Sequence, residues 1–112
     1  MKIAISAEKN NIESEVSEVF GRCRYFIVAE IEGGNIKQTE AIENENIKKA
    51  GGAGVAAVQV IVAKDVEAVI AENIGPRAMD VLRQFNIKAY AGKGIVKDVL
   101  QDYIEGNLKL IQ

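Results

Sequence analysis

The stretch YFIVAEIEGGNIKQTEA, residues 25–41, decides how the first half of this chain folds. Its first part, Tyr25–Ile31, is rich in β-branched and aromatic side chains, which favour a strand. The glycines within Glu32–Asn35 tolerate the positive φ angles that a tight turn requires, so this segment indicates a hairpin. We therefore expect Ile36–Ala41 to return as a second strand, antiparallel to the first.

A further strand is expected before this hairpin. Lys2–Ser6 alternates isoleucines with small or polar residues, and it is apolar enough on both faces to lie centrally in a sheet. The segment Ala7–Glu18 is polar and acidic, and together with Ile42–Ala50 it is expected to be the least ordered part of the chain. The first half of the sequence thus predicts an antiparallel meander of three strands.

The second half alternates helices with strands. The apolar run after Gly54 is too long for a typical strand and contains several alanines, so it predicts a buried helix. Proline is favourable at the first position of a helix, and apolar side chains recur every three or four residues after Pro76 and after Gly94. The expected elements are, in order, helix Val55–Lys64, strand Val66–Ala71, a helix from Pro76, strand Ile87–Tyr90 and a helix capped by Gly106.

These elements predict an α/β fold. Strands that are separated by helices normally run parallel within one sheet, so the sheet should be mixed and five-stranded. We expect three antiparallel strands followed by two parallel strands, with three helices. The length of 112 residues fits a single domain over residues 1–112.

Composition excludes several classes of protein. The net charge of −2 argues against a non-specific nucleic-acid binder, which needs a basic face. No apolar run approaches the roughly 18 residues that cross a membrane. The start of the chain predicts a strand rather than a signal peptide, and a single cysteine allows no internal disulfide. These features favour a cytoplasmic protein that binds neither nucleic acid nor membrane.

Cys23 stands between two of the four arginines of the chain, Arg22 and Arg24. A thiolate is a good ligand for iron–sulfur clusters, and neighbouring guanidinium groups lower the pKa of a thiol. Cys23 is therefore a candidate metal ligand, and both arginines are candidate cofactor-binding residues. The alternative is a half-buried thiol that fills space beside a strand.

Two predicted helix starts are further candidates for a binding site. Gly51, Gly52 and Gly54 open one helix, and Gly75 precedes another that carries Arg77 in its first turn. The free N–H groups of a helix start hold anions, and glycines let a ligand approach the backbone closely. The alternative for the glycines is tight packing of a helix start against the sheet.

Three of the four arginines lie in these candidate loops, which favours an anionic ligand. The alternative is that they cap or bridge loops without any ligand.

Catalytic constellations are not recognisable in the sequence. Metal-dependent nucleases need clustered acids that include one in the first strand, and Lys2–Ser6 contains none. Glu72 follows a predicted strand but has no partner at a suitable position. The serines lack an activating histidine, because the chain contains no histidine. We therefore expect a binding protein rather than an enzyme.

Several short blocks together resemble one known family, the dinitrogenase iron–molybdenum cofactor-binding, or nitrogenase accessory factor, family. The resemblance covers essentially the whole chain and implies a ribonuclease H-like fold. It further implies that the protein binds or carries an iron–molybdenum cofactor or an iron–sulfur precursor cluster, with cofactor-assembly proteins as partners. The blocks are Met1–Ile5, Ser14–Ser17, Phe20–Arg22 with Tyr25 and Phe26, Gly51–Gly54, and Val69–Ala71 with Gly75 and Pro76.

The chain departs from the family at two positions. Many members carry histidines where this chain has Val19 and Gly51, so Cys23 alone remains of the ligands that the resemblance suggests. A single thiolate cannot complete the coordination of a cluster, so we expect weak or partner-dependent loading of a monomer or weak homodimer. The alternative function is a small regulatory or interaction domain of the same fold that has lost cluster binding.

Overall fold

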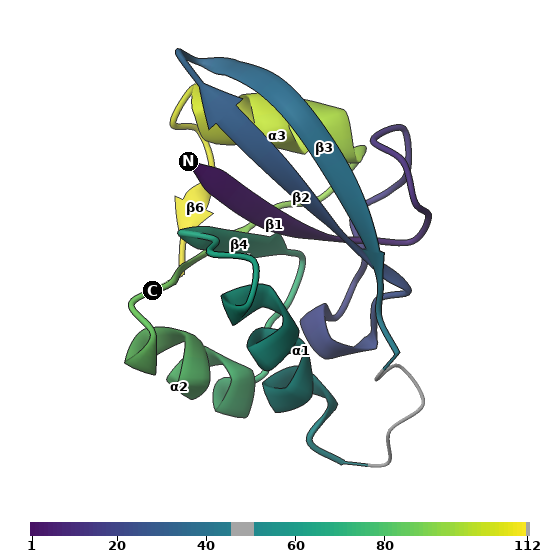
Figure 1. Cartoon of the computed structure of the whole chain (residues 1–112), viewed down its shortest axis with the longest axis vertical. Helices are drawn as coiled ribbons and strands as arrows, with labels where there is room; N and C mark the ends of the chain where they lie inside the picture. The colour runs from purple at the N-terminus through teal and green to yellow at the C-terminus, as the bar shows by residue number, and fades with distance from the viewer. Residues whose placement is uncertain (46–50, 112) are drawn as a thin grey trace.

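The computed structural model describes residues 1–45 and 51–111. It is an α/β fold in which a mixed sheet of six strands, in the order β3-β2-β1-β4-β5-β6, carries α-helices on both faces (Figure 1). The helices are α1 (Ala53–Val62), α2 (Pro76–Gln84) and α3 (Val96–Ile104). The strands are β1 (Lys2–Ala7), β2 (Tyr25–Glu32), β3 (Asn35–Glu43), β4 (Ala68–Ala71), β5 (Lys88–Ala91) and β6 (Lys109–Leu110).

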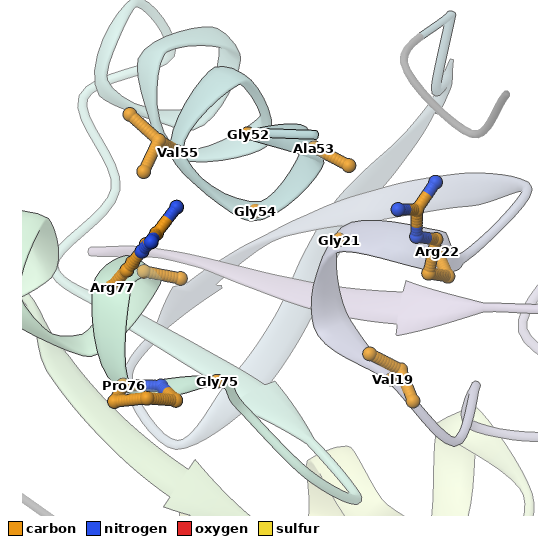
Figure 2. Close-up of a pocket in the computed structure, with 11 residues that line it drawn as sticks. Val19, Gly21, Arg22, Gly52, Ala53, Gly54, Val55, Gly75, Pro76 and Arg77 are labelled. Atoms are coloured by element: carbon orange, nitrogen blue, oxygen red, sulfur yellow. The ribbon is translucent and has the colours of Figure 1, made fainter. Parts of the chain in front are cut away.

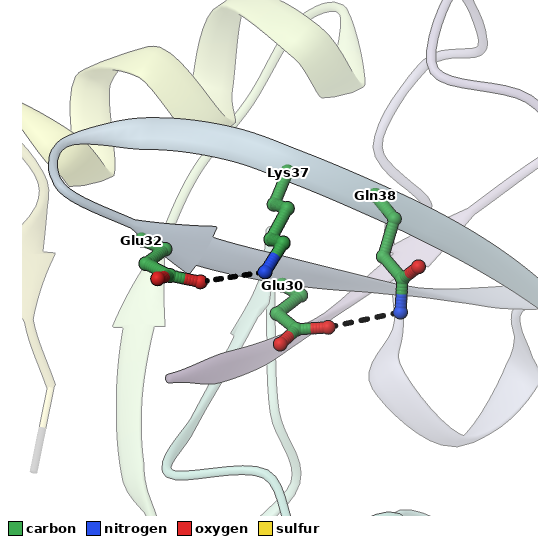
Figure 3. A network of polar contacts seen from close by, with 4 residues as sticks. All are labelled: Glu30, Glu32, Lys37 and Gln38. Atoms are coloured by element: carbon green, nitrogen blue, oxygen red, sulfur yellow. Dashed lines mark hydrogen bonds and ion pairs between the residues drawn. The ribbon is translucent and has the colours of Figure 1, made fainter.

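The predicted hairpin is confirmed as β2 and β3. Gly33 and Gly34 have φ angles of 60° and 79° in its turn, which side chains with a Cβ rarely adopt. On the outer surface, Lys37 Nζ lies 3.0 Å from a Glu32 carboxylate oxygen, and Gln38 donates to Glu30 at 2.9 Å (Figure 3). Exposed contacts of this kind stabilise little, so β3 is a polar edge strand held mainly by its ladder to β2.

β1 is the central strand, as the sequence predicted. It pairs antiparallel with β2 on one side and parallel with β4 on the other. The pairing of β4 with β5 is also parallel, so both helix-separated strands run as expected. β1 is buried from Ile3 through Ala7, because helices cover both of its faces.

Two apolar clusters fill the space between the sheet and the helices. The cluster on one face contains Phe20, Phe26 and Val69 together with side chains of α1 and α2. The cluster on the other face joins Ile5 and Ile70 to side chains of α3. Figure 1 accordingly shows α1 and α2 on one side of the sheet and α3 on the other.

The structure differs from the predicted elements in several places, including α1, which was predicted over Val55–Lys64 but spans Ala53–Val62. A sixth strand, β6, pairs antiparallel with β5, so the prediction of a five-stranded sheet was wrong. The predicted strand start at Val66 was also too early, since β4 begins at Ala68. A short 3-10 helix, η1 (Phe20–Arg22), precedes β2. The predicted mobile segment 42–50 begins inside β3, and its residues 46–50 lie outside the described residues.

One edge of the sheet collects the helix starts. Both β1 and β3 are antiparallel to β2, so β1, β3, β4 and β5 all run in the same direction. The chain leaves β3, β4 and β5 towards α1, α2 and α3, so these helices begin at the carboxyl ends of the strands. Ligands in open α/β sheets bind preferentially at this edge. Within the described residues, no helix is long and apolar enough to span a membrane.

Candidate functional site

A cleft of about 330 Å³ lies at the carboxyl edge of the sheet, between η1 and the first turns of α1 and α2 (Figure 2). Three segments that are far apart in the sequence therefore form its walls. Arg77 extends from α2 towards the first turn of α1, whereas Arg22 stands on η1 (Figure 2). The lining residues are Val19, Gly21, Arg22, Gly52, Ala53, Gly54, Val55, Gly75, Pro76, Arg77 and Ala78.

The wall that carries Arg22 is held at the end of β4. The Phe20 N–H donates to the Asn73 carbonyl at 3.0 Å, and the Asn73 N–H donates to the Glu18 carbonyl at 2.9 Å. The buried Phe20 ring packs against Phe26, with ring centroids 5.2 Å apart. We call residues 20–24, which comprise η1 and its exit, the arginine turn. Its backbone is thus fixed to the sheet by both hydrogen bonds and packing.

Glycines let the three walls approach one another closely. A Cβ atom added at Gly21 would lie 2.6 Å from the Gly54 nitrogen, a distance that real contacts do not allow. A Cβ atom at Gly54 would in turn lie 3.1 Å from the Ala78 Cβ. Gly54 is therefore tightly packed, but against η1 and α2 rather than against the sheet as the alternative interpretation of the glycine cluster expected. At Gly52 a glycine is favoured by the backbone conformation instead, because this residue directly precedes α1 with a φ angle of 72°.

The cleft has a positive electrostatic character. A helix start carries a partial positive charge and unpaired N–H groups, and two of them border the cleft. Within the described residues, α1 and α2 receive no side-chain cap and carry no acidic residue in their first turns, whereas α3 carries Asp98 there. The described lining residues include two arginines and no carboxylate. An anion would therefore be attracted by both arginines and by both helix starts.

Residues 1–106 match the sequence model of the family described as dinitrogenase iron–molybdenum cofactor. The chain belongs to this family. It is also similar, at 36% identity over 110 residues, to an uncharacterized protein of Methanocaldococcus jannaschii, a match that covers 97% of this chain and 90% of the relative.

Two solved structures resemble this member of the iron–molybdenum cofactor family in both fold and sequence. The apo form of the orange protein from Desulfovibrio gigas superposes with a TM-score of 0.88 at 25% identity, covering 97% of this chain and 91% of that one. A Thermotoga protein provisionally named as NifB superposes with a TM-score of 0.83 at 35% identity, covering 98% and 92%. The fold that carries the cleft thus recurs in these two proteins.

Five of the residues singled out in the sequence line the cleft of this family member: Arg22, Gly52, Gly54, Gly75 and Arg77. Gly51 and Arg24 are exposed and lie outside the lining. Val19, where many members of the iron–molybdenum cofactor family were expected to carry a histidine, does line the cleft and is 41% exposed.

Cys23 lies in the core rather than in the cleft. Its side chain is fully buried, and its Sγ donates to the Phe20 carbonyl at 3.2 Å. Burial raises the pKa of the Cys23 thiol to about 12, because the thiolate would lose its hydration. The described residues contain no group of three or more histidine, cysteine or carboxylate side chains placed to hold a metal ion. These observations argue against Cys23 as a metal ligand and favour its space-filling alternative.

Sequence reasoning missed the apolar part of the lining and one buried polar residue. Ala53, Val55 and Pro76 line the cleft only because of how the helix starts meet, and no motif marks such residues. Asn44 lies outside the lining but is only 4% exposed, and it contacts the arginine turn. Its sequence context, a polar segment after a strand, resembles that of any surface loop.

Proposed function

We propose that this protein is a non-enzymatic binding or carrier domain for an anionic metal–sulfur cofactor or its precursor, held in the cleft. The observation that carries the proposal is that Arg22, Arg77 and two helix starts, which have no side-chain cap among the described residues, line one cleft in a chain of the iron–molybdenum cofactor family. A volume of about 330 Å³ lies within the usual range for small-ligand sites. The finer assignments, a ribonuclease H-like fold, a cytoplasmic location and cofactor-assembly proteins as partners, are part of this proposal.

The described residues of the cleft fit the outer atoms of such a group, not its metal ions. Guanidinium and backbone N–H groups donate to sulfide, thiolate or carboxylate atoms, and such charge-assisted bonds are the strong ones. The described lining residues include no thiolate, imidazole or carboxylate that could coordinate iron. The metal ions would therefore keep their own ligands or receive them from a partner protein. This supports weak or partner-dependent loading rather than a permanently bound cluster.

A second candidate function is a regulatory or interaction domain that has lost cluster binding. The same absence of coordinating side chains from the described lining favours it, as does Val19 at one of the positions where a histidine was expected. The two functions differ in one measurable respect. Only the carrier requires the arginines of the cleft to bind a metal–sulfur anion.

Anaerobic equilibrium dialysis against a synthetic iron–sulfur cluster with thiolate ligands tests the proposal. We expect Arg22→Ala and Arg77→Ala each to weaken binding by about 1–3 kcal/mol, the usual scale for hydrogen bonds to charged groups. Arg83→Ala is the matched control, because Arg83 lies on the same helix as Arg77 and pairs with Asp80 at 3.0 Å outside the cleft. Iron analysis and the absorption spectrum measure the amount bound.

The outcomes separate the two candidate functions. Equal loss of binding in all three arginine variants would indicate a diffuse charge effect and would contradict the proposed site. The absence of binding to wild type, with and without cofactor-assembly proteins, would favour the regulatory or interaction domain. Sulfate, a small dianion without metal or sulfide, serves as the competitor. If sulfate displaces the cluster at similar concentration, the cleft selects negative charge rather than metal–sulfur chemistry.

A further inference from the structure

Asn44, the residue directly after β3, fastens the arginine turn to the end of the hairpin. Its side-chain Nδ2 donates to the carbonyl of Gly21 at 3.2 Å and to that of Cys23 at 2.8 Å. Its backbone N–H donates to the carbonyl of Arg24 at 2.9 Å. A single residue from a distant part of the sequence therefore holds three carbonyl groups of one short turn.

Asn44 is buried where it makes these hydrogen bonds. It is only 4% exposed, although its neighbours Glu43 and Glu45 are both exposed. Burying an amide costs free energy unless the amide is hydrogen-bonded, and an apolar residue would fill the same space without that cost. An apolar side chain would, however, leave the carbonyls of Gly21 and Cys23 without these donors.

The two carbonyls that the Asn44 side chain holds lie on either side of Arg22 in the sequence. They belong to the peptide groups of residues 21 and 23, so the backbone that carries the Arg22 side chain is fixed between them. Asn73 holds the beginning of the same turn through the Phe20 N–H, and Gly54 contacts Gly21 closely. Asn44 thus attaches the arginine turn to the end of β3, whereas Asn73 attaches it to the end of β4.

We propose that Asn44 is a positioning residue of the anion site: by holding the arginine turn, it keeps Arg22 at the wall of the cleft. The identity of the ligand rests on the proposed function, whereas the fixing of the turn does not. A guanidinium group that is already in place loses less entropy when an anion binds, which increases affinity. Loss of the Nδ2 donors should therefore weaken binding without removing any group that touches the ligand.

A double-mutant cycle with the synthetic iron–sulfur cluster as the probe tests this coupling. Asn44→Ala should weaken binding about tenfold, the effect of one or two ordinary hydrogen bonds. The same tenfold loss is expected in the Arg77→Ala background. In the Arg22→Ala background the loss should nearly disappear, because Asn44 acts through Arg22. Equal losses in all three backgrounds would overturn the proposal, since a merely structural effect weakens every background alike.

Asn44→Leu separates the hydrogen bonds from the shape of the side chain. Leucine has a similar size and no charge, but it has no donor for the carbonyls of Gly21 and Cys23. We expect Asn44→Leu to bind the probe as weakly as Asn44→Ala. Binding like that of wild type would show that the donors do not position the turn.

The buried thiol of Cys23 gives a readout that requires no ligand. Its Sγ lies beneath the turn, 3.2 Å from the Phe20 carbonyl oxygen, so a loosened turn exposes it to an aromatic disulfide reagent. Asn44→Ala should react at least about tenfold faster than Val99→Ala, a control that removes buried volume from α3 in the apolar cluster on the other face of the sheet, which does not include Cys23. Equal rates at matched stability would contradict the positioning role. If wild type binds no probe, the proposed function fails. Because Asn44 Nδ2 also lies 3.9 Å from the Cys23 Sγ, the rate for Asn44→Leu, which still covers the thiol but lacks the donors, then decides whether Asn44 fixes the turn.

Discussion

At the scale of single residues, Cys23 illustrates that burial outweighs neighbouring charge. Two arginines flank it in the sequence, and on that basis its thiol pKa was expected to be lowered. The structure buries the thiol completely, while Arg22 and Arg24 are exposed, and loss of hydration raises the pKa from 9.0 to about 12. The thiolate that a cluster would need is therefore scarce at neutral pH.

This raised pKa predicts a specific dependence of stability on pH. Between about pH 9 and pH 12 the unfolded chain releases the Cys23 proton while the folded protein retains it, so the free energy of unfolding falls as pH rises. The expected slope is about 1.4 kcal/mol per pH unit. Urea unfolding at several pH values should show this slope in wild type beyond that of Cys23→Ala, in which all other titrating groups are unchanged. Parallel curves would contradict the burial of the thiol.

The pattern of exposure at the entry to β2 separates Cys23 from the two arginines beside it. At the entry to β2 the chain alternates, so Arg22 and Arg24 are exposed and Cys23 between them is buried. Such alternation is typical of a strand entry, yet Cys23 was predicted as a metal ligand from its neighbours in the sequence, with space-filling only as the alternative. What separates Arg22 from Arg24 is η1, which places only Arg22 at the cleft. A three-residue 3-10 helix has no periodicity from which it could be predicted.

At the scale of elements, the contact between η1 and α1 depends on Gly21. A methyl group there would lie 2.6 Å from the backbone nitrogen of Gly54 and 2.7 Å from its Cα, and backbone atoms cannot move aside cheaply. We expect Gly21→Ala to lower the free energy of unfolding by about 1–3 kcal/mol, the usual cost of overpacking. Gly75→Ala is the control, since a Cβ at Gly75 meets no atom within 4 Å. Chemical denaturation measures both, and equal stabilities would refute the close contact.

Elements with local sequence signals could be predicted, whereas an element that depends on pairing with a distant strand could not. The hairpin and the three helices follow from local turn residues and apolar periodicity, and they were found. β6 depends instead on pairing with β5, where the Ile111 N–H donates to the Ala89 carbonyl at 2.8 Å. A strand of two residues carries no alternation of its own, so no local signal could have revealed it.

The acidic segment between β1 and η1 provides a test of predicted mobility. The sequence predicted low order for residues 7–18, yet the Val16 N–H donates to the Gly94 carbonyl at 2.8 Å and the Ser17 N–H donates to the Ser6 carbonyl at 3.0 Å. We expect the amide hydrogens of Val16 and Ser17 to exchange slowly, and those of Asn10 and Asn11 at the exposed tip to exchange fast. Hydrogen exchange followed by NMR measures all four. Fast exchange throughout would restore the prediction of a mobile segment.

At the scale of the whole molecule, the direction of the strands determines where the cleft lies. The change from an antiparallel meander to helix-separated parallel strands was predictable from turn and periodicity signals, and it sends α1, α2 and α3 out from the same edge. The sequence could therefore indicate the edge at which a ligand binds. It could not indicate that α1 and α2 share one face of the sheet while α3 takes the other, because that depends on packing between elements distant in the sequence.

This separation into two layers predicts that truncations on opposite faces of the sheet act independently. Val58 of α1 and Val99 of α3 are buried in different clusters, on either side of the sheet. Each substitution to alanine should lower the free energy of unfolding by about 2 kcal/mol, from lost burial and a small cavity. The double variant should lose the sum, about 4 kcal/mol, because the two side chains share no partner.

Urea denaturation measures all three variants, and a coupling above about 1 kcal/mol would mean that the sheet transmits strain between its faces. In that case ligand binding between α1 and α2 would also be sensitive to Val99→Ala; with independent layers, Val99→Ala leaves the affinity of the cleft unchanged.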